Sequence, residues 1–274
     1  MSRMMEPMSP IQTLRAALRE RTRRAVSLSP MTPLEQLRAG HTVRRVSQLL
    51  VGLWLYGTAM AMFIRAELGL DPWDVFHYGV QQHLGWSFGT VVIAVGALVL
   101  LLWIPLRQWP GLGTVANVFV IGIATDVMLG ILETPDALWL RWVLLLGGIV
   151  VNGIGGAMYI GSQYGPGPRD GLMTGVARRT GLSIRLVRTS LEITVLAVGW
   201  LLGGVVGVGT VIYALLIGPA VQAFLPMLTV EVTPPARLAR GIADDSAVDG
   251  QGEGQDPVDA RPTQLAARDG ERPA

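Results

Sequence analysis

The sequence contains no cysteine, no lysine and few charged residues, and each shortage narrows what the protein can be. Without cysteine, disulfides, thiolate zinc sites and thiol nucleophiles are excluded. Charged residues make up 15% of the 274 residues while 50% are hydrophobic, so the chain is too apolar for a typical soluble domain. All 22 basic residues are arginine, and they are not gathered in one polar domain, which argues against a nucleic-acid partner. Composition therefore favours a membrane protein.

Six apolar segments each approach the length of about 20 residues that a helix needs to cross about 30 Å of hydrocarbon. They cover approximately residues 46–64, 86–106, 111–132, 142–162, 186–204 and 206–228. The sequence therefore predicts an all-α membrane protein with six transmembrane helices in residues 45–228. Residues 1–44 and 229–274 are more polar, and we interpret them as tails, the second one disordered. In the first tail, a short amphipathic helix around residues 11–24 is an alternative to disorder.

The arginines beside the spans predict the orientation, because cytoplasmic loops carry an excess of basic residues. Arg44 and Arg45 end the first tail, whereas the loop after the first span holds Asp71 and Asp74. With six spans, both termini are expected in the cytoplasm. The loop between the fourth and fifth spans is the most basic, with Arg169, Arg178, Arg179, Arg185 and Arg188. We interpret most of these five arginines as topological anchors.

The chain contains an internal repeat. Residues 69–79 read GLDPWDVFHYG and residues 165–175 read GPGPRDGLMTG, so Pro72 and Asp74 fall on Pro168 and Asp170, a shift of 96 residues. The same shift pairs GLGTV at 111–115 with GVGTV at 207–211 without a gap. Repeat 1 covers about residues 45–132 and repeat 2 about residues 141–228. Because each copy holds three spans, an odd number, the second copy is expected to cross the membrane inverted relative to the first.

Each copy is expected to form a short helix after its Pro-x-Asp motif. Proline suits the first turn of a helix, and a carboxylate there is favoured by the positive end of the helix dipole. Gly85 and Gly181 are expected to end these two helices. We expect each helix to be interfacial or partly re-entrant, one on each face of the membrane.

The motifs GPGPRDGLMTG, GVGTVIYALLIGP, DPWDV and GLGTVANVFVIG resemble those of the YczE/YyaS/YitT-like family of bacterial integral membrane proteins, most closely its YczE branch. The resemblance covers about residues 45–228 and leaves both tails outside. It implies a location in the plasma membrane. YczE-like proteins have been associated with production of lipopeptide secondary metabolites, so it also implies an accessory role in such a system. It carries over no catalytic or ligand residues.

The aspartates shared by both copies are the first candidate site residues. Asp74 and Asp170 are expected either to contact a ligand or act as gates at opposite membrane faces, or simply to cap the starts of the two short helices. Arg169, beside Asp170, is a further candidate for ligand contact, although its interpretation as an anchor remains open.

Glu192 is a candidate because it falls about two turns into the fifth span, where an ionisable residue needs a partner or an aqueous cavity. Arg188 lies four residues earlier on the same side of the helix and is the expected partner, in a structural or a functional pair. Asp126, near the outer end of the third span, is either a site residue or merely interfacial. Asn117, Asn152 and Tyr213 are expected to hydrogen-bond between helices. Several glycines are expected to let helices approach closely: Gly52, Gly57, Gly148, Gly153, Gly155 and Gly156.

Enzymatic functions are disfavoured because no Ser-His-Asp grouping, nucleophile elbow or P-loop is present. Asp74, His77 and His83 follow no usual metal-ligand spacing, so we expect neither a metal nor a cofactor. Inverted repeats typically place a ligand site between two halves that can rock, which favours a transporter- or permease-like protein for a small molecule. The alternative is a non-transporting accessory protein that supports a biosynthetic or export system. Either way, the lipid bilayer is the expected partner.

Overall fold

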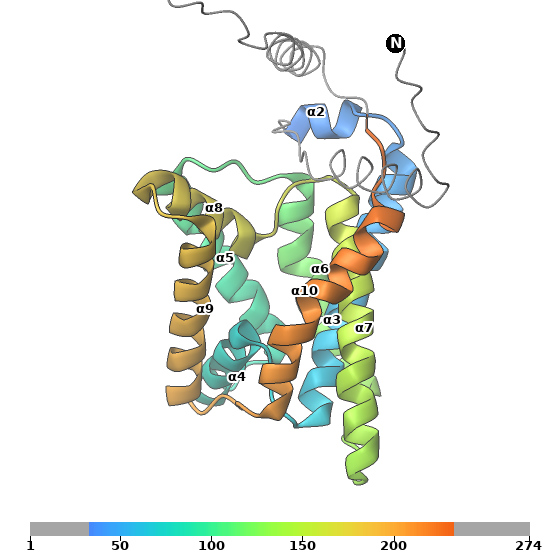
Figure 1. Cartoon of the computed structure of the whole chain (residues 1–274), viewed down its shortest axis with the longest axis vertical. Helices are drawn as coiled ribbons and strands as arrows, with labels where there is room; N and C mark the ends of the chain where they lie inside the picture. The colour runs from blue at the N-terminus through green and yellow to red at the C-terminus, as the bar shows by residue number, and fades with distance from the viewer. Residues whose placement is uncertain (1–32, 233–274) are drawn as a thin grey trace, which may run out of the picture. The chain divides into compact units, whose positions relative to one another are not determined.

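The computed structural model describes residues 33–232, so the predicted helix around residues 11–24 and most of the C-terminal tail lie outside the described residues. Within this range the chain forms nine α-helices and no strand (Figure 1). The all-α class is therefore confirmed for the described residues. The helices are α2 Pro33–Arg38, α3 Thr42–Ala66, α4 Pro72–Leu84, α5 Phe88–Leu106, α6 Leu112–Ile131, α7 Leu138–Gly161, α8 Pro168–Thr180, α9 Ile184–Leu201 and α10 Val208–Leu228.

Five of these helices are long and apolar enough to cross a membrane, namely α3, α5, α6, α7 and α10. They occupy five of the six predicted segments. The remaining segment forms α9, a helix of 18 residues. Because α9 carries three charged residues, Arg185, Arg188 and Glu192, it is less apolar than the five candidate membrane spans and is not counted among them. All six predicted segments are thus helical, and five of them match a membrane span by length and apolar content.

The two short helices form where the sequence predicts them. α4 begins at Pro72 and α8 begins at Pro168. Gly85 and Gly181 follow their last residues with φ angles of 66° and 72°, in the left-handed region that glycine adopts without strain. The start and end signals read from the sequence are therefore confirmed.

The cap of α4 is Asp71 and not Asp74. Asp71 Oδ1 accepts hydrogen bonds from the backbone N–H groups of Trp73 at 2.9 Å and of Asp74 at 3.1 Å. The equivalent position before α8 is Gly167, which has no side chain to cap with. Asp74 and Asp170 lie inside the first helical turn instead, so the interpretation of Asp74 as the cap is wrong. Asp170, the third residue of α8, is not the N-cap residue either, but its carboxyl accepts a hydrogen bond from the backbone of Gly167 at the start of that helix.

Glycine allows α3 and α7 to pack backbone against backbone. A Cβ atom added at Gly52 would lie 2.8 Å from the carbonyl oxygen of Gly155, and one added at Gly155 would lie 2.7 Å from that of Gly52. Gly57 meets α6 and Gly153 meets α10 at similarly short range. The predicted role of these glycines in close helix packing is confirmed.

Contacts of one half of the chain recur 96 residues later with the partners exchanged. Gly113 N donates to Tyr164 O at 2.9 Å, and 96 residues after Gly113, Gly209 N donates to Leu68 O at 2.7 Å. Likewise α4 packs on α9 as α8 packs on α5, so these pairs also exchange partners between the halves. Within each half, α3 packs on α6 as α7 packs on α10. The two halves are therefore joined by reciprocal contacts in which each supplies the partner for the other.

α4 and α8 lie at opposite ends of the bundle. α4 precedes the start of α5 and packs against the C-terminal end of α9, where a Cβ atom at Gly199 would collide with the backbone of Phe76. α8 precedes the start of α9 and packs against the C-terminal end of α5, where Gly171 meets the ring of Trp103. Figure 1 shows the two short helices near either end of α9.

One helix contact of the first half has no counterpart in the second half. α5 and α6 pack closely where Gly89 meets Gly122. Their equivalents α9 and α10 hardly touch each other within residues 33–232. A Cβ atom at Gly218, the counterpart of Gly122, would meet nothing within 4 Å. The second pair of helices thus stands apart where the first pair is closed.

The α3–α7 contact predicts how sensitive the bundle is to one methyl group. Gly155→Ala should lower the free energy of unfolding by about 1–3 kcal/mol, because the new Cβ would press on the backbone of α3. Gly130→Ala, in α6 with no atom within 4 Å of its Cβ position, should have no such cost and serves as the control. Denaturant unfolding of both variants in detergent measures the difference. Equal stability of the two variants would contradict the packing described here.

Candidate functional site

A cavity of about 400 Å³ lies between the two halves of the chain. The starts of α4 and α8 and parts of α9 and α10 give it polar walls, and residues of α3, α5, α6 and α7 complete the lining. Its volume falls in the range of about 300–1,000 Å³ that is typical of small-molecule sites. The bundle therefore encloses space for a small organic molecule.

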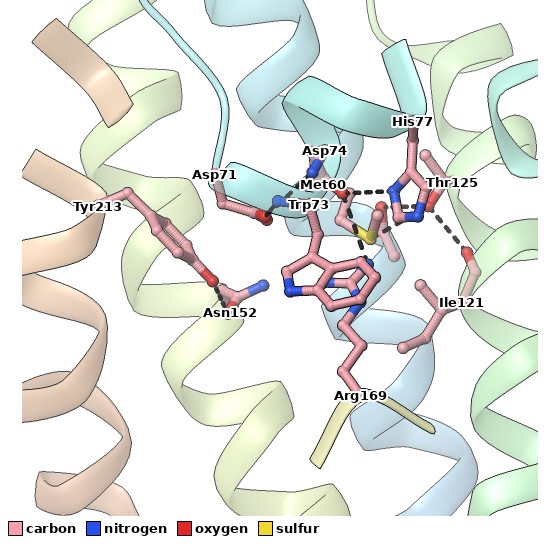
Figure 2. A network of polar contacts seen from close by, with 11 residues as sticks. Met60, Asp71, Trp73, Asp74, His77, Ile121, Thr125, Asn152, Arg169 and Tyr213 are labelled. Carbon is pink, nitrogen blue, oxygen red and sulfur yellow. Dashed lines mark hydrogen bonds and ion pairs between the residues drawn. The ribbon is translucent and has the colours of Figure 1, made fainter. Parts of the chain in front are cut away.

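Two equivalent residues of the repeat meet at this cavity. The guanidinium carbon of Arg169 lies 4.8 Å from the centre of the Trp73 ring, and the two residues are 96 positions apart. Arg169 Nη2 also lies 3.9 Å from Asp74 Oδ1. Figure 2 shows Arg169 reaching from the start of α8 toward Trp73 on α4. Trp103 Nε1 fixes the start of α8 by donating to the carbonyl oxygen of Pro168 at 3.0 Å.

Acidic side chains gather at the start of α4. Asp71 lines the cavity, and Asp74 lies behind it, where its Oδ1 is 3.2 Å from His77 Nδ1. All three side chains are buried. The Oδ2 atoms of Asp71 and Asp74 accept no hydrogen bond from any part of the chain that the structure describes. Two buried carboxylates thus share one nearby guanidinium, that of Arg169.

The other polar wall comes from α8, α9, α7 and α10. Arg188 Nε donates to Glu192 Oε1 at 2.9 Å, and both residues line the cavity together with Asp170. Tyr213 Oη lies 3.5 Å from Asn152 Oδ1, which links α10 to α7 across the cavity lining. Figure 2 shows this pair beside Asp71. The predicted Arg188–Glu192 pair is formed, and Asn152 and Tyr213, which were each predicted to hydrogen-bond between helices, do so with each other.

Comparison with known proteins identifies the family. Residues 43–226 match the family of unknown function DUF6198. The chain belongs to this family.

Proteins similar to this chain are found in two bacteria. An uncharacterized protein of Haemophilus influenzae is 40% identical over 185 residues, which cover 68% of this chain and 85% of the relative. The uncharacterized membrane protein YczE of Bacillus subtilis is 33% identical over 177 residues, covering 64% and 82%. The uncharacterized protein YyaS of the same bacterium is 22% identical over 182 residues, covering 65% and 90%.

No solved structure matches the chain. The resemblance to YczE and YyaS read from the motifs is confirmed. Together with its five apolar helices, this makes the DUF6198 chain a membrane protein.

Six candidate site residues were predicted from the sequence, and four of them line the cavity between the two halves: Arg169, Asp170, Arg188 and Glu192. Asp74 contacts Arg169 from directly behind the lining. Asp126 lies elsewhere. It accepts hydrogen bonds from Ser87 Oγ at 2.5 Å and from Gly89 N at 2.7 Å, and so holds the start of α5 against α6.

Arg169 differs from the other arginines of its loop. Arg178, Arg179 and Arg185 are exposed at the surface, as topological anchors should be. The side chain of Arg169 is 26% exposed and lies inside the bundle against Trp73 and Asp74. The interpretation of Arg169 as a surface anchor is therefore wrong.

Sequence reasoning missed Asp71 and Trp73 as site residues. The signal for Asp71 is the dipeptide Asp-Pro at the start of a helix, which combines a cap with proline at the first helical position. Trp73 could have been found from the repeat, since it is the residue that Arg169 replaces in the second copy. His83 Nδ1 donates to the carbonyl oxygen of Gly79 in its own helix at 3.0 Å. The described residues contain no group of three acidic or histidine side chains that could hold a metal.

The position of Arg169 predicts a coupled effect on stability. Arg169→Ala should lower the free energy of unfolding by about 3 kcal/mol, because Asp74 would be left buried beside Asp71 with no cation nearby. Adding Asp74→Asn should recover part of this loss. A double-mutant cycle of unfolding in detergent measures the coupling. If the losses of unfolding free energy in the two single variants simply add up in the double variant, the two side chains do not interact.

Proposed function

We propose that this protein is a transporter- or permease-like protein for a small molecule. The observation that carries the proposal is the cavity of about 400 Å³ between the two halves of the chain, lined by charged and aromatic side chains from both. In transporters built from inverted repeats, the ligand site lies at the interface between the repeats. We propose no catalytic reaction for this site.

The proposal includes six spans arranged as two inverted repeats, with α9 as the sixth. Arg188 and Glu192, two of the three charged residues of α9, line the cavity and pair with each other. Charged residues of a transmembrane helix are tolerated where they pair and face a cavity. The reciprocal hydrogen bonds of Gly113 and Gly209 support the inversion, because related halves that face each other exchange their partners.

In this arrangement α4 and α8 enter the membrane from opposite faces, and their N-terminal ends meet at the cavity. The contact between Trp73 and Arg169, the same position of the two copies, supports this view. Discontinuous helices whose N-terminal ends face the substrate are a recurring feature of inverted-repeat transporters. The membrane is the plasma membrane, and both termini are cytoplasmic, as the distribution of arginines favours.

The difference between the two helix pairs supports a rocking motion. α5 and α6 are closed at Gly89 and Gly122, whereas their equivalents α9 and α10 stand apart. Alternating access requires that a site between two related halves be closed on one side of the membrane and open on the other, and that the two sides exchange during transport. The different packing of the two helix pairs fits this requirement. We propose that the structure represents one of these two states.

Glu192 tests the proposal against an accessory role. Metabolites inside and outside cells with and without the gene should identify a compound whose distribution depends on the protein. Glu192→Gln should reduce its flux roughly tenfold or more, because the change leaves Arg188 unpaired at the cavity wall. The exposed Glu133→Gln is the matched control and should transport normally.

Equal amounts of each variant in the membrane must be verified. A protein that keeps its full cellular effect with Glu192→Gln, and with no compound redistributed, would support the accessory role instead.

A further inference from the structure

The charges around the cavity do not balance. Asp71, Asp170 and Glu192 line it, and Asp74 lies directly behind. Two guanidinium groups, those of Arg169 and Arg188, face these four carboxylates. Asp71 and Asp74 are buried and Arg169 is 26% exposed, whereas Asp170 and Arg188 are exposed and Glu192 is 34% exposed. In the buried part of the cavity, on the α4 side, two carboxylates therefore face one guanidinium, and such an excess disfavours an anionic ligand and favours a cation.

Both guanidinium groups are already engaged. Arg188 donates to Glu192 at 2.9 Å. Arg169 lies over the ring of Trp73 and next to Asp74. Neither arginine therefore pairs fully with Asp71, which is the carboxylate at the cavity wall on the α4 side.

Asp71 keeps one oxygen for a further partner. Its Oδ1 accepts from two backbone N–H groups, while no N–H or hydroxyl group of residues 33–232 donates to its Oδ2, and its side-chain neighbour within hydrogen-bonding range is the carboxyl of Asp74. Only 3% of the residue is exposed. A buried carboxylate oxygen without a donor costs free energy, and a hydrogen bond from a charged donor is the strongest way to offset this cost.

Aromatic rings surround the same region. Tyr56, Trp73, Tyr159 and Tyr213 line the cavity, and Trp73 already holds the guanidinium of Arg169 against one face. Aromatic faces attract organic cations through their quadrupoles. Three buried polar groups in the lining also have no hydrogen-bond partner among the described residues and could bind the rest of a ligand: Trp73 Nε1, Asn152 Nδ2 and Tyr159 Oη.

We propose that the cavity binds a small organic cation whose ammonium group contacts Asp71 Oδ2 among these aromatic rings. The inference rests on the proposed function, because it names the class of ligand for the same cavity. A volume of about 400 Å³ suits an organic molecule better than a bare metal ion. The neighbouring Trp73 Nε1 and Asn152 Nδ2 donors fit an amine that also carries hydrogen-bond acceptors, such as hydroxyl or carbonyl groups.

Calorimetric binding to the purified full chain in detergent tests the ligand class without requiring transport. The cationic probes are tetramethylammonium, ethanolamine and 2-phenylethylamine, and the anionic control is 3-phenylpropanoate, which matches the last of these in size. At least one cation should bind and the anion should not. Asp71→Asn should weaken cation binding roughly tenfold or more, because it removes the charge facing the ammonium group.

Asp71→Asn is a suitable variant because asparagine caps a helix about as well as aspartate, so α4 should still form. Asp136→Asn makes the same chemical change at an exposed position outside the cavity lining and should bind the cation normally. The proposal is overturned if no cation binds, if the anion binds equally well, or if Asp71→Asn and Asp136→Asn behave alike.

The outcomes also separate this inference from the proposed function. Cation binding that depends on Asp71, in a protein for which no gene-dependent flux is found, would leave the ligand class standing and contradict transport. Gene-dependent flux of an anion, with none of the three cations bound, would leave transport standing and contradict the ligand class.

Discussion

The guanidinium of Arg169 lies inside the helical bundle, and the site depends on how this one charge is accommodated. A buried cation without a partner would be costly, and more so in a membrane protein, where lipid offers no hydrogen bonds. The ring of Trp73 and the carboxylate of Asp74 offset that cost. Because Arg169 and Trp73 lie at the starts of α8 and α4, their side-chain contact links the N-terminal ends of the two short helices across the cavity.

Glycine supplies the second constraint. Gly52 and Gly155 bring the backbones of α3 and α7 together, and these two helices are equivalent in the two copies. The polar residues of the site lie in the space between the halves that this close packing does not fill, and the cavity forms there. Where Gly89 and Gly122 close the pair α5 and α6, Asp126 reinforces the contact by holding the start of α5. The counterpart pair α9 and α10 has no such contact at Gly218.

Local patterns in the sequence predicted local structure well. Proline and glycine marked the bounds of α4 and α8, and the four-residue spacing of Arg188 and Glu192 predicted their ion pair. The sequence could not show which residues far apart in the chain meet. The repeat identified position 169 as the equivalent of position 73, but not that the two touch. Asp126 contacts Ser87, 39 residues away, through packing that no spacing rule describes.

The proposed inverted arrangement of the two copies can be tested directly, because the chain contains no cysteine. Leu84 and Thr180 are equivalent, exposed residues at the ends of α4 and α8. Single cysteines at these positions would be treated in cells, and in inside-out vesicles, with a thiol reagent that does not cross the membrane. With the two copies inverted, Leu84→Cys should react only from outside and Thr180→Cys only from inside. Reaction of both from the same side would contradict it.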